Sequence, residues 1–215
     1  MLTRRLGFRP LIIASAVVLG GIVATIHGCA TAPPQQLDDV CAIFAEKNDW
    51  YFDALKTQQR WGTPVPVLMA IIRHESAFES DAKPPRKRFL WIFPGARPST
   101  AYGYAQALDS TWDHYRDATG KRGADRDDFA DAIDFIGWYN DQTYQKNGIA
   151  KTDAYNLYLA YHEGQGGYTQ GSYQGKSWLK QYARQVALRA DTYRNQLLGC
   201  ESSLSRQNHG WWPLS

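Results

Sequence analysis

Apolar residues recur at intervals of three and four along most of the chain, the spacing that places them on one face of a helix. The clearest case is residues 66–75, where Val67, Leu68 and Ile71 share a face and Pro66 stands in the first turn, a position that needs no backbone N–H. The same spacing predicts helices over residues 39–56, 109–119, 127–146, 153–161 and 177–198. No sustained alternation with a period of two competes, so we predict a mainly α fold.

Aromatic residues are abundant, with 13 Tyr and 8 Trp, and flat rings of this kind can stack on the C–H faces of sugars. The alternative is that they fill an ordinary core, where aromatic side chains also dominate. In the last predicted helix, one stripe combines aromatic, aliphatic and basic side chains: Trp178, Tyr182, Val186, Arg189, Tyr193 and Leu197.

The N-terminus has the pattern of a secretory signal peptide, which we place at residues 1–28. Three arginines (Arg4, Arg5 and Arg9) precede an uncharged apolar run over residues 11–26. About 20 apolar residues are needed to span a membrane, so a retained anchor is the less favoured alternative. The end of the run, up to Cys29, looks like a bacterial lipoprotein signal, although His27 departs from the usual small or aliphatic residue.

This resemblance implies that Cys29 is acylated and that residues 29–38 form a tether to the membrane. More than one acyl chain suffices for stable anchoring. Ala30 follows the cysteine where an aspartate would commonly indicate retention at the inner membrane. By this analogy, the protein is exported and anchored at the periplasmic face of the outer membrane.

Charge argues against nucleic acid as a partner. The net charge of +3 is accounted for by the three arginines of the signal, so the remaining chain is close to neutral. About 180 residues remain, enough for one domain with its own core. We assign residues 39–200 to this domain and residues 201–215 to a C-terminal tail, in which the role of the Trp211–Trp212 pair is left open.

The two remaining cysteines, Cys41 and Cys200, lie near the two ends of the predicted domain. An oxidising compartment permits a disulfide between them, and it would close a loop of about 160 residues. The alternative is two unpaired thiols. Neither a Cys-x-x-Cys pair nor a His-Glu-x-x-His segment is present, so we expect no metal site.

Glu75 ends the apolar segment 66–75 and is the strongest candidate for chemistry. Burial at the edge of a core and the negative end of a helix dipole both raise a carboxyl pKa, so this side chain could hold a proton near neutral pH. The alternative is a solvated glutamate at a frayed helix end, because charged residues are mostly exposed.

Three sequence blocks in order resemble the soluble lytic transglycosylase family, which has a goose-type-lysozyme-like fold. They are Glu75-Ser76, then residues 103–106 (Gly-Tyr-Ala-Gln), then residues 160–166 (Ala-Tyr-His-Glu-Gly-Gln-Gly). The resemblance covers about residues 61–168. It implies a single helical domain with a substrate groove, which acts on peptidoglycan glycan strands without metal or cofactor.

The resemblance also implies a mechanism for cleaving the β-1,4 bond between N-acetylmuramic acid and N-acetylglucosamine. Glu75 would protonate the leaving oxygen and then deprotonate the sugar's own 6-hydroxyl, giving a 1,6-anhydro product. Ser76 would orient Glu75 or contact substrate, and the Tyr161 phenol would hydrogen-bond toward Glu75.

The family's substrate-binding positions correspond to five residues of this chain. They are Gly103, Tyr104, Gln106, His162 and Glu163. Gln106 offers both a donor and an acceptor to an acetamido sugar. Tyr104, Ala105 and His162 replace the family's Leu, Met and Asn, which predicts a groove of different shape and a possible pH sensitivity.

Two alternatives remain open at this point. The protein could be a muramidase that hydrolyses the same bond with a second carboxylate, for which Asp81, Asp109 and Glu163 are the candidates. It could also be a non-catalytic peptidoglycan-binding lipoprotein. A loop at residues 83–100, with five Lys or Arg and no acid, either forms one wall of the groove or is a solvated basic loop.

Overall fold

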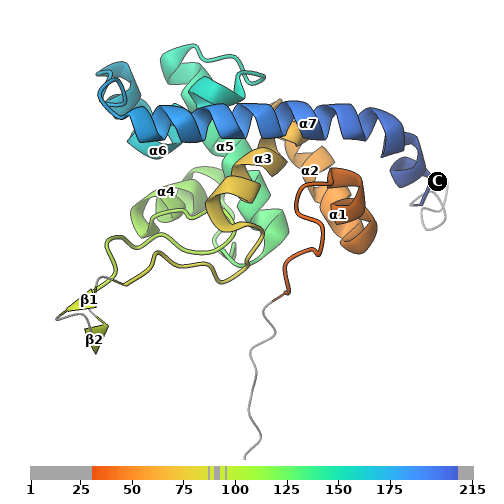
Figure 1. Cartoon of the computed structure of the whole chain (residues 1–215), viewed down its shortest axis with the longest axis horizontal. Helices are drawn as coiled ribbons and strands as arrows, with labels where there is room; N and C mark the ends of the chain where they lie inside the picture. Colours follow the sequence, from red (N-terminus) through yellow and green to blue (C-terminus); the bar gives the residue numbers. More distant parts are fainter. Residues whose placement is uncertain (1–30, 87, 90–92, 95, 208–215) are drawn as a thin grey trace, which may run out of the picture.

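The computed structural model describes residues 31–86, 88–89, 93–94 and 96–207. Within these residues the chain is mainly helical, as predicted, with seven helices and one two-stranded hairpin (Figure 1). The helices are α1 Val40–Glu46, α2 Asn48–Trp61, α3 Val65–Ser76, α4 Asp109–Thr119, α5 Phe129–Asn147, α6 Ala154–Thr169 and α7 Ser177–Gln207. The strands β1 Arg88–Phe89 and β2 Phe93–Pro94 pair antiparallel.

The helix α3 lies at the centre of the fold. Every residue from Val65 to Ile72 is buried, as expected for a helix that is apolar on all sides. The long helix α7 crosses α1, α3 and α6, while α5 packs against α2, α3 and α6 (Figure 1). This arrangement holds the C-terminal end of α3 next to α6.

The helix α7 does not bury the whole of its predicted stripe. Its buried positions follow the spacing of a continuous packing seam: Leu179, Ala183, Val186, Ala190, Tyr193, Leu197 and Leu204. Trp178 and Tyr182 each lie one residue before a residue of this seam, and these two residues are 45% and 42% exposed. The stripe seen in the sequence thus begins with two aromatic residues that lie beside the packing seam, because Leu179 and Ala183 set the register.

Three predicted helices differ clearly in extent from the observed ones. The helix predicted over residues 177–198 is α7, which continues to Gln207. The segment 39–56 is divided at Lys47 into α1 and α2, and α2 continues to Trp61. The helix α6 continues beyond residue 161 through a kink at Gly164, where φ is 73° and ψ is 156°. Glycine adopts this backbone conformation without the steric penalty of a side chain.

The N-terminal part of the described chain is fastened to α7. Cys41 and Cys200 form a disulfide with a Cα–Cα distance of 6.1 Å. The Tyr193 hydroxyl donates to the Leu37 carbonyl oxygen, and the Val40 N–H donates to the Gln196 side chain at 2.9 Å. These contacts place the segment that enters α1 against α7.

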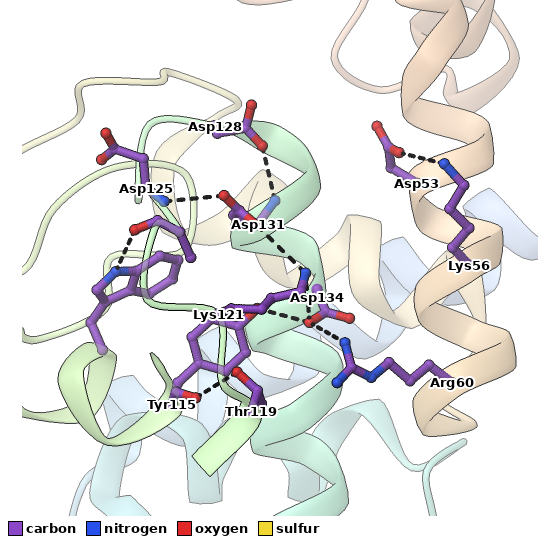
Figure 2. A network of polar contacts seen from close by, with 12 residues as sticks. Asp53, Lys56, Arg60, Tyr115, Thr119, Lys121, Asp125, Asp128, Asp131 and Asp134 are labelled. Atoms are coloured by element: carbon purple, nitrogen blue, oxygen red, sulfur yellow. Dashed lines mark hydrogen bonds and ion pairs between the residues drawn. The ribbon is translucent and has the colours of Figure 1, made fainter. Parts of the chain in front are cut away.

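A buried carboxylate, Asp134 on α5, joins three further parts of the chain. It accepts hydrogen bonds from the Trp61 indole at 2.9 Å and the Tyr115 hydroxyl at 2.7 Å. Lys121 and Arg60 form ion pairs with it at 3.1 and 3.4 Å (Figure 2). Because a buried charge is tolerated only when it is paired and hydrogen-bonded, this network fixes α2 and α4 on α5.

No helix in the described ranges is long and apolar enough to cross a membrane. The predicted signal peptide, Cys29 and the Trp211–Trp212 pair lie outside the described residues.

Candidate functional site

Glu75 lies in the last turn of α3, where the buried helix reaches the surface. The helix ends because Ala77 and Phe78 both adopt left-handed backbone conformations, with φ of 51° and 64°. Glu75 itself is partly accessible, whereas Phe78 is fully buried. The carboxyl group is thus held at the edge of the core by a rigid element and can still be reached from outside.

The surroundings of Glu75 favour its protonated form. Desolvation raises the pKa of this carboxyl to about 7, and a hydrogen bond with Tyr158 acts in the opposite direction. A solvated glutamate at a frayed helix end would not experience this desolvation. A carboxyl that titrates near neutral pH can both donate and accept a proton under physiological conditions.

Two tyrosines of α6, Tyr158 and Tyr161, lie close to Glu75. Burial, together with the charge of Glu75, raises the pKa of each phenol, so both hydroxyls remain protonated donors. Tyr161 donates to the Ala105 carbonyl oxygen at 2.6 Å, and Tyr158 is the residue hydrogen-bonded to Glu75.

The Tyr161 hydroxyl was expected to hydrogen-bond toward Glu75. The hydroxyl instead donates its hydrogen bond to Ala105, and this bond connects α6 to the loop that carries Ala105. Tyr158 was not among the residues predicted from the sequence motifs. The available signal was its position three residues before Tyr161, which places both phenols on the same face of α6.

Ser76 does not have the orientation expected for supporting Glu75. The residue is buried, and its hydroxyl donates to the Ile72 carbonyl oxygen at 3.3 Å. The Ile72 carbonyl already faces the Ser76 backbone N–H along the helix, so the hydroxyl is a second donor to the same oxygen. This bond satisfies the buried Ser76 hydroxyl within α3 and does not direct it toward Glu75.

The loop at residues 103–106 is locked into one conformation. Gly103 has φ of 75°, and a side chain there would collide with the Arg126 carbonyl oxygen. The Gln106 side-chain amide donates to the carbonyl oxygens of Ala82 and Gly103 at 2.9 and 2.8 Å. The donors expected to bind an acetamido sugar are thus used to hold the loop, and Gln106 positions the Ala105 carbonyl that binds Tyr161.

Tyr104 is a core residue, so the prediction that it contacts substrate was wrong. Its side chain is 1% exposed, and its ring packs edge-on against Trp50 and Phe129, with centroid distances of 5.6 Å to each. The Trp50 and Phe129 rings thus surround the Tyr104 ring with apolar contacts. Burial also raises the pKa of the Tyr104 phenol to about 12.

Glu163 is an ionised, structural carboxylate. Burial alone would raise its pKa, but hydrogen bonds from Lys176, Ser172 and His162 outweigh burial and lower the pKa to about 2. The Lys176 ammonium lies 2.7 and 2.8 Å from the two carboxylate oxygens. These bonds close the segment between α6 and α7, so the expectation that Glu163 binds substrate finds no support in its contacts.

His162 is exposed and lies beside α7. Its Nδ1 is 3.0 Å from a Glu163 oxygen, and its ring is 5.1 Å from that of Trp178. The side chain therefore belongs to the surface near the start of α7, where substrate could still reach it.

The candidates for a second catalytic carboxylate have other partners or lie exposed. Asp109 forms an ion pair with Arg126 at 2.8 Å, Glu163 is paired with Lys176, and Asp81 is exposed. In the part of the chain that the structure describes, no group of three or more His, Cys, Asp or Glu side chains could hold a metal ion.

The loop at residues 83–100 is described only in part. The Arg97 guanidinium donates to the Pro84 carbonyl oxygen at 2.5 Å and so closes the base of the loop. The β1–β2 hairpin extends away from the helices (Figure 1). Residues 87, 90–92 and 95 lie outside the described chain, so the predicted role of the loop stays a prediction.

A comparison with models of protein families identifies a match to this chain. A family model described as the transglycosylase SLT domain matches residues 17–200, which is most of the chain. The matched span contains α3 with Glu75, the loop at 103–106 and both tyrosines of α6. A search of curated proteins finds no match.

Proposed function

Because the chain belongs to the transglycosylase SLT domain family, whose activity on peptidoglycan is of the lytic transglycosylase type, we propose that it cleaves the β-1,4 bond between N-acetylmuramic acid and N-acetylglucosamine. The product is a 1,6-anhydro-muramyl end. The observation that carries this proposal is the partly accessible Glu75, whose desolvated carboxyl has a pKa of about 7.

In this reaction Glu75 acts twice. Its proton passes to the glycosidic oxygen as the bond breaks and positive charge develops at the anomeric carbon. The resulting carboxylate then takes the proton of the sugar's 6-hydroxyl, which attacks the same carbon and closes the anhydro ring. A pKa near the working pH suits a group that must give a proton and then accept one.

Tyr158 supports the first half of this cycle, in which Glu75 gives up its proton. Its hydrogen bond favours the ionised form of Glu75, as the direction of its effect on the Glu75 pKa indicates. Tyr161 acts indirectly: its hydrogen bond to the Ala105 carbonyl oxygen fixes that loop against α6. The ion pairs of Glu163 and Asp109 favour a one-carboxylate mechanism over hydrolysis with a second carboxylate.

We further propose that the protein is exported and lipid-anchored. Residues 1–28 are then a cleaved signal, Cys29 the acylated residue and residues 29–38 the tether. Residues 39–200 are the enzyme domain, whose last helix α7 continues to Gln207 into the segment assigned to the tail, residues 201–215. The disulfide between Cys41 and Cys200 supports an oxidising compartment such as the periplasm. A Cys29→Ser variant that keeps the membrane association of the wild type would contradict the anchor.

Mass spectrometry of the soluble products tests the reaction. Purified peptidoglycan is incubated with the wild-type protein, with Glu75→Gln and with Glu79→Gln, which alters an exposed glutamate four residues away. We expect products one water molecule lighter than hydrolytic muropeptides from the wild type and Glu79→Gln only. Reducing-end products would identify a muramidase, and binding without release by any form would identify a non-catalytic protein.

A further inference from the structure

A groove of about 440 Å³, lined by both apolar and polar side chains, lies between α3 and α7 and is not part of the Glu75 site described above. Its polar and charged lining comes from both helices: Arg73, His74, Gln185, Arg189 and Thr192. Two of these residues are arginines, so the groove has the chemistry of a site for anions.

A carboxylate of the chain itself already lies at this groove. One oxygen of Asp38 forms ion pairs with Arg73 at 3.1 Å and with Arg189 at 3.0 Å. The Asp38 side chain is 64% exposed, so another carboxylate in solution can compete for the same guanidinium groups.

An exposed aromatic surface continues from the groove along α7. Trp178 and Tyr182 stand outside the packing seam, with their rings 5.6 Å apart. Tyr182 contacts His74, which lines the groove, and His74 contacts Tyr158, each with a centroid distance of 5.0 Å. Because Tyr158 is hydrogen-bonded to Glu75, these contacts join the aromatic surface and the groove to the catalytic glutamate.

We propose that this continuous surface is a subsite for peptide-bearing glycan. A sugar of the strand stacks on Trp178 and Tyr182, and a free carboxylate of its peptide stem binds Arg73 and Arg189 in place of Asp38. The inference rests on the proposed function for the identity of the glycan. The charge and shape of this surface agree with such an occupant, since sugar rings offer flat C–H faces and peptide stems carry carboxylates.

Binding measured without cleavage tests this subsite. In the Glu75→Gln background, co-sedimentation compares glycan strands that carry peptide stems with strands from which the stems have been removed. We expect the stem-bearing strands to bind about twofold more tightly, less than the effect of one exposed ion pair, because the stem carboxylate must displace Asp38. Replacing both arginines with glutamine (Arg73→Gln, Arg189→Gln) should remove this preference, and high salt should weaken it.

Three further variants separate the subsite from a purely structural role of the arginines. Arg184→Gln removes the same charge from α7 outside the groove and should keep the preference. Trp178→Ala should weaken binding of both strand types. Asp38→Ala should strengthen binding of stem-bearing strands, because it removes the competing carboxylate.

Two results would overturn the subsite. The first is that the Glu75→Gln protein, with Arg73 and Arg189 in place, binds both strand types equally. The second is that Asp38→Ala leaves the binding of stem-bearing strands unchanged or weaker. Thermal unfolding of each variant identifies any loss of folding, and the Asp38→Ala result does not require either arginine to be changed. The readout is independent of catalysis. A wild-type protein that releases no anhydro product but shows the preference would refute the proposed reaction and leave the subsite standing.

Discussion

Replacing Glu75 with glutamine should abolish cleavage and at the same time stabilise the fold at neutral and alkaline pH. In the folded protein the pKa of this carboxyl is raised to about 7 from an ordinary value of 4.5, mainly by desolvation. The unfolded chain therefore releases the proton first as the pH rises. Wild-type stability falls between these two pKa values and then levels off, whereas the glutamine variant lacks this loss.

The size of the effect follows from the two pKa values. A tenfold change in a proton-binding constant corresponds to about 1.4 kcal/mol, so the ionised carboxylate destabilises the folded state by about 3 kcal/mol at pH 8. At about pH 4 the carboxyl is protonated in both states, and the contribution vanishes. For a domain of this size, 3 kcal/mol corresponds to a difference in Tm of about 6–12 °C.

Urea unfolding at several pH values measures this difference. The free energy of unfolding of Glu75→Gln minus that of the wild type should grow by about 3 kcal/mol from pH 4 to pH 8. Glu79→Gln, the same substitution at an exposed position, should stay within about 0.5 kcal/mol of the wild type throughout. A Glu75→Gln difference that does not change with pH would refute the idea that the fold holds this carboxyl in a desolvated place.

Three other substitutions test separate parts of the arrangement. Tyr158→Phe removes a hydrogen bond that lowers the pKa of Glu75, so the alkaline limb of the pH–rate profile should shift to higher pH. We expect a loss in rate of about tenfold, and an alkaline limb at the wild-type pH would contradict the contact. Gly103→Ala places a side chain against a backbone carbonyl at a positive φ and should lower the free energy of unfolding by more than about 2 kcal/mol in urea; near-wild-type stability would show that the loop can adapt. Cys41→Ser opens the disulfide to Cys200 and should lower the same quantity by about 4 kcal/mol; reductant should destabilise the wild type equally and leave the variant unchanged.

The sequence predicted those features that depend on neighbours along the chain. Periodicity identified the helical class, and the position of Glu75 after a buried apolar segment predicted a desolvated carboxyl. The structure adds that Gly103 has a positive φ, a backbone conformation for which glycine is the usual residue. Such features depend on local backbone geometry, which residue type and spacing describe directly.

Other features depend on contacts between distant segments and could not be read in this way. Whether the loop residue Tyr104 faces substrate or core is decided by Trp50 on α2 and Phe129 on α5. The choice between Tyr158 and Tyr161 as the partner of Glu75 depends on how α6 is rotated against α3. Lys176, which fixes the protonation state of Glu163, comes from the start of the next helix and gave no signal in the sequence motif.

The end of α3 shows how local strain and packing together produce the site. Non-glycine residues in left-handed conformations cost about 1–3 kcal/mol each, and two follow one another at Ala77 and Phe78. Burial of Phe78 against Trp50, with ring centroids 5.7 Å apart, contributes about 1.5–3 kcal/mol in return. This packing forces the chain to turn immediately after Ser76, so Glu75 lies in the last turn of the helix. Its backbone is held by the core, and its carboxyl group is hydrogen-bonded to the Tyr158 phenol of α6.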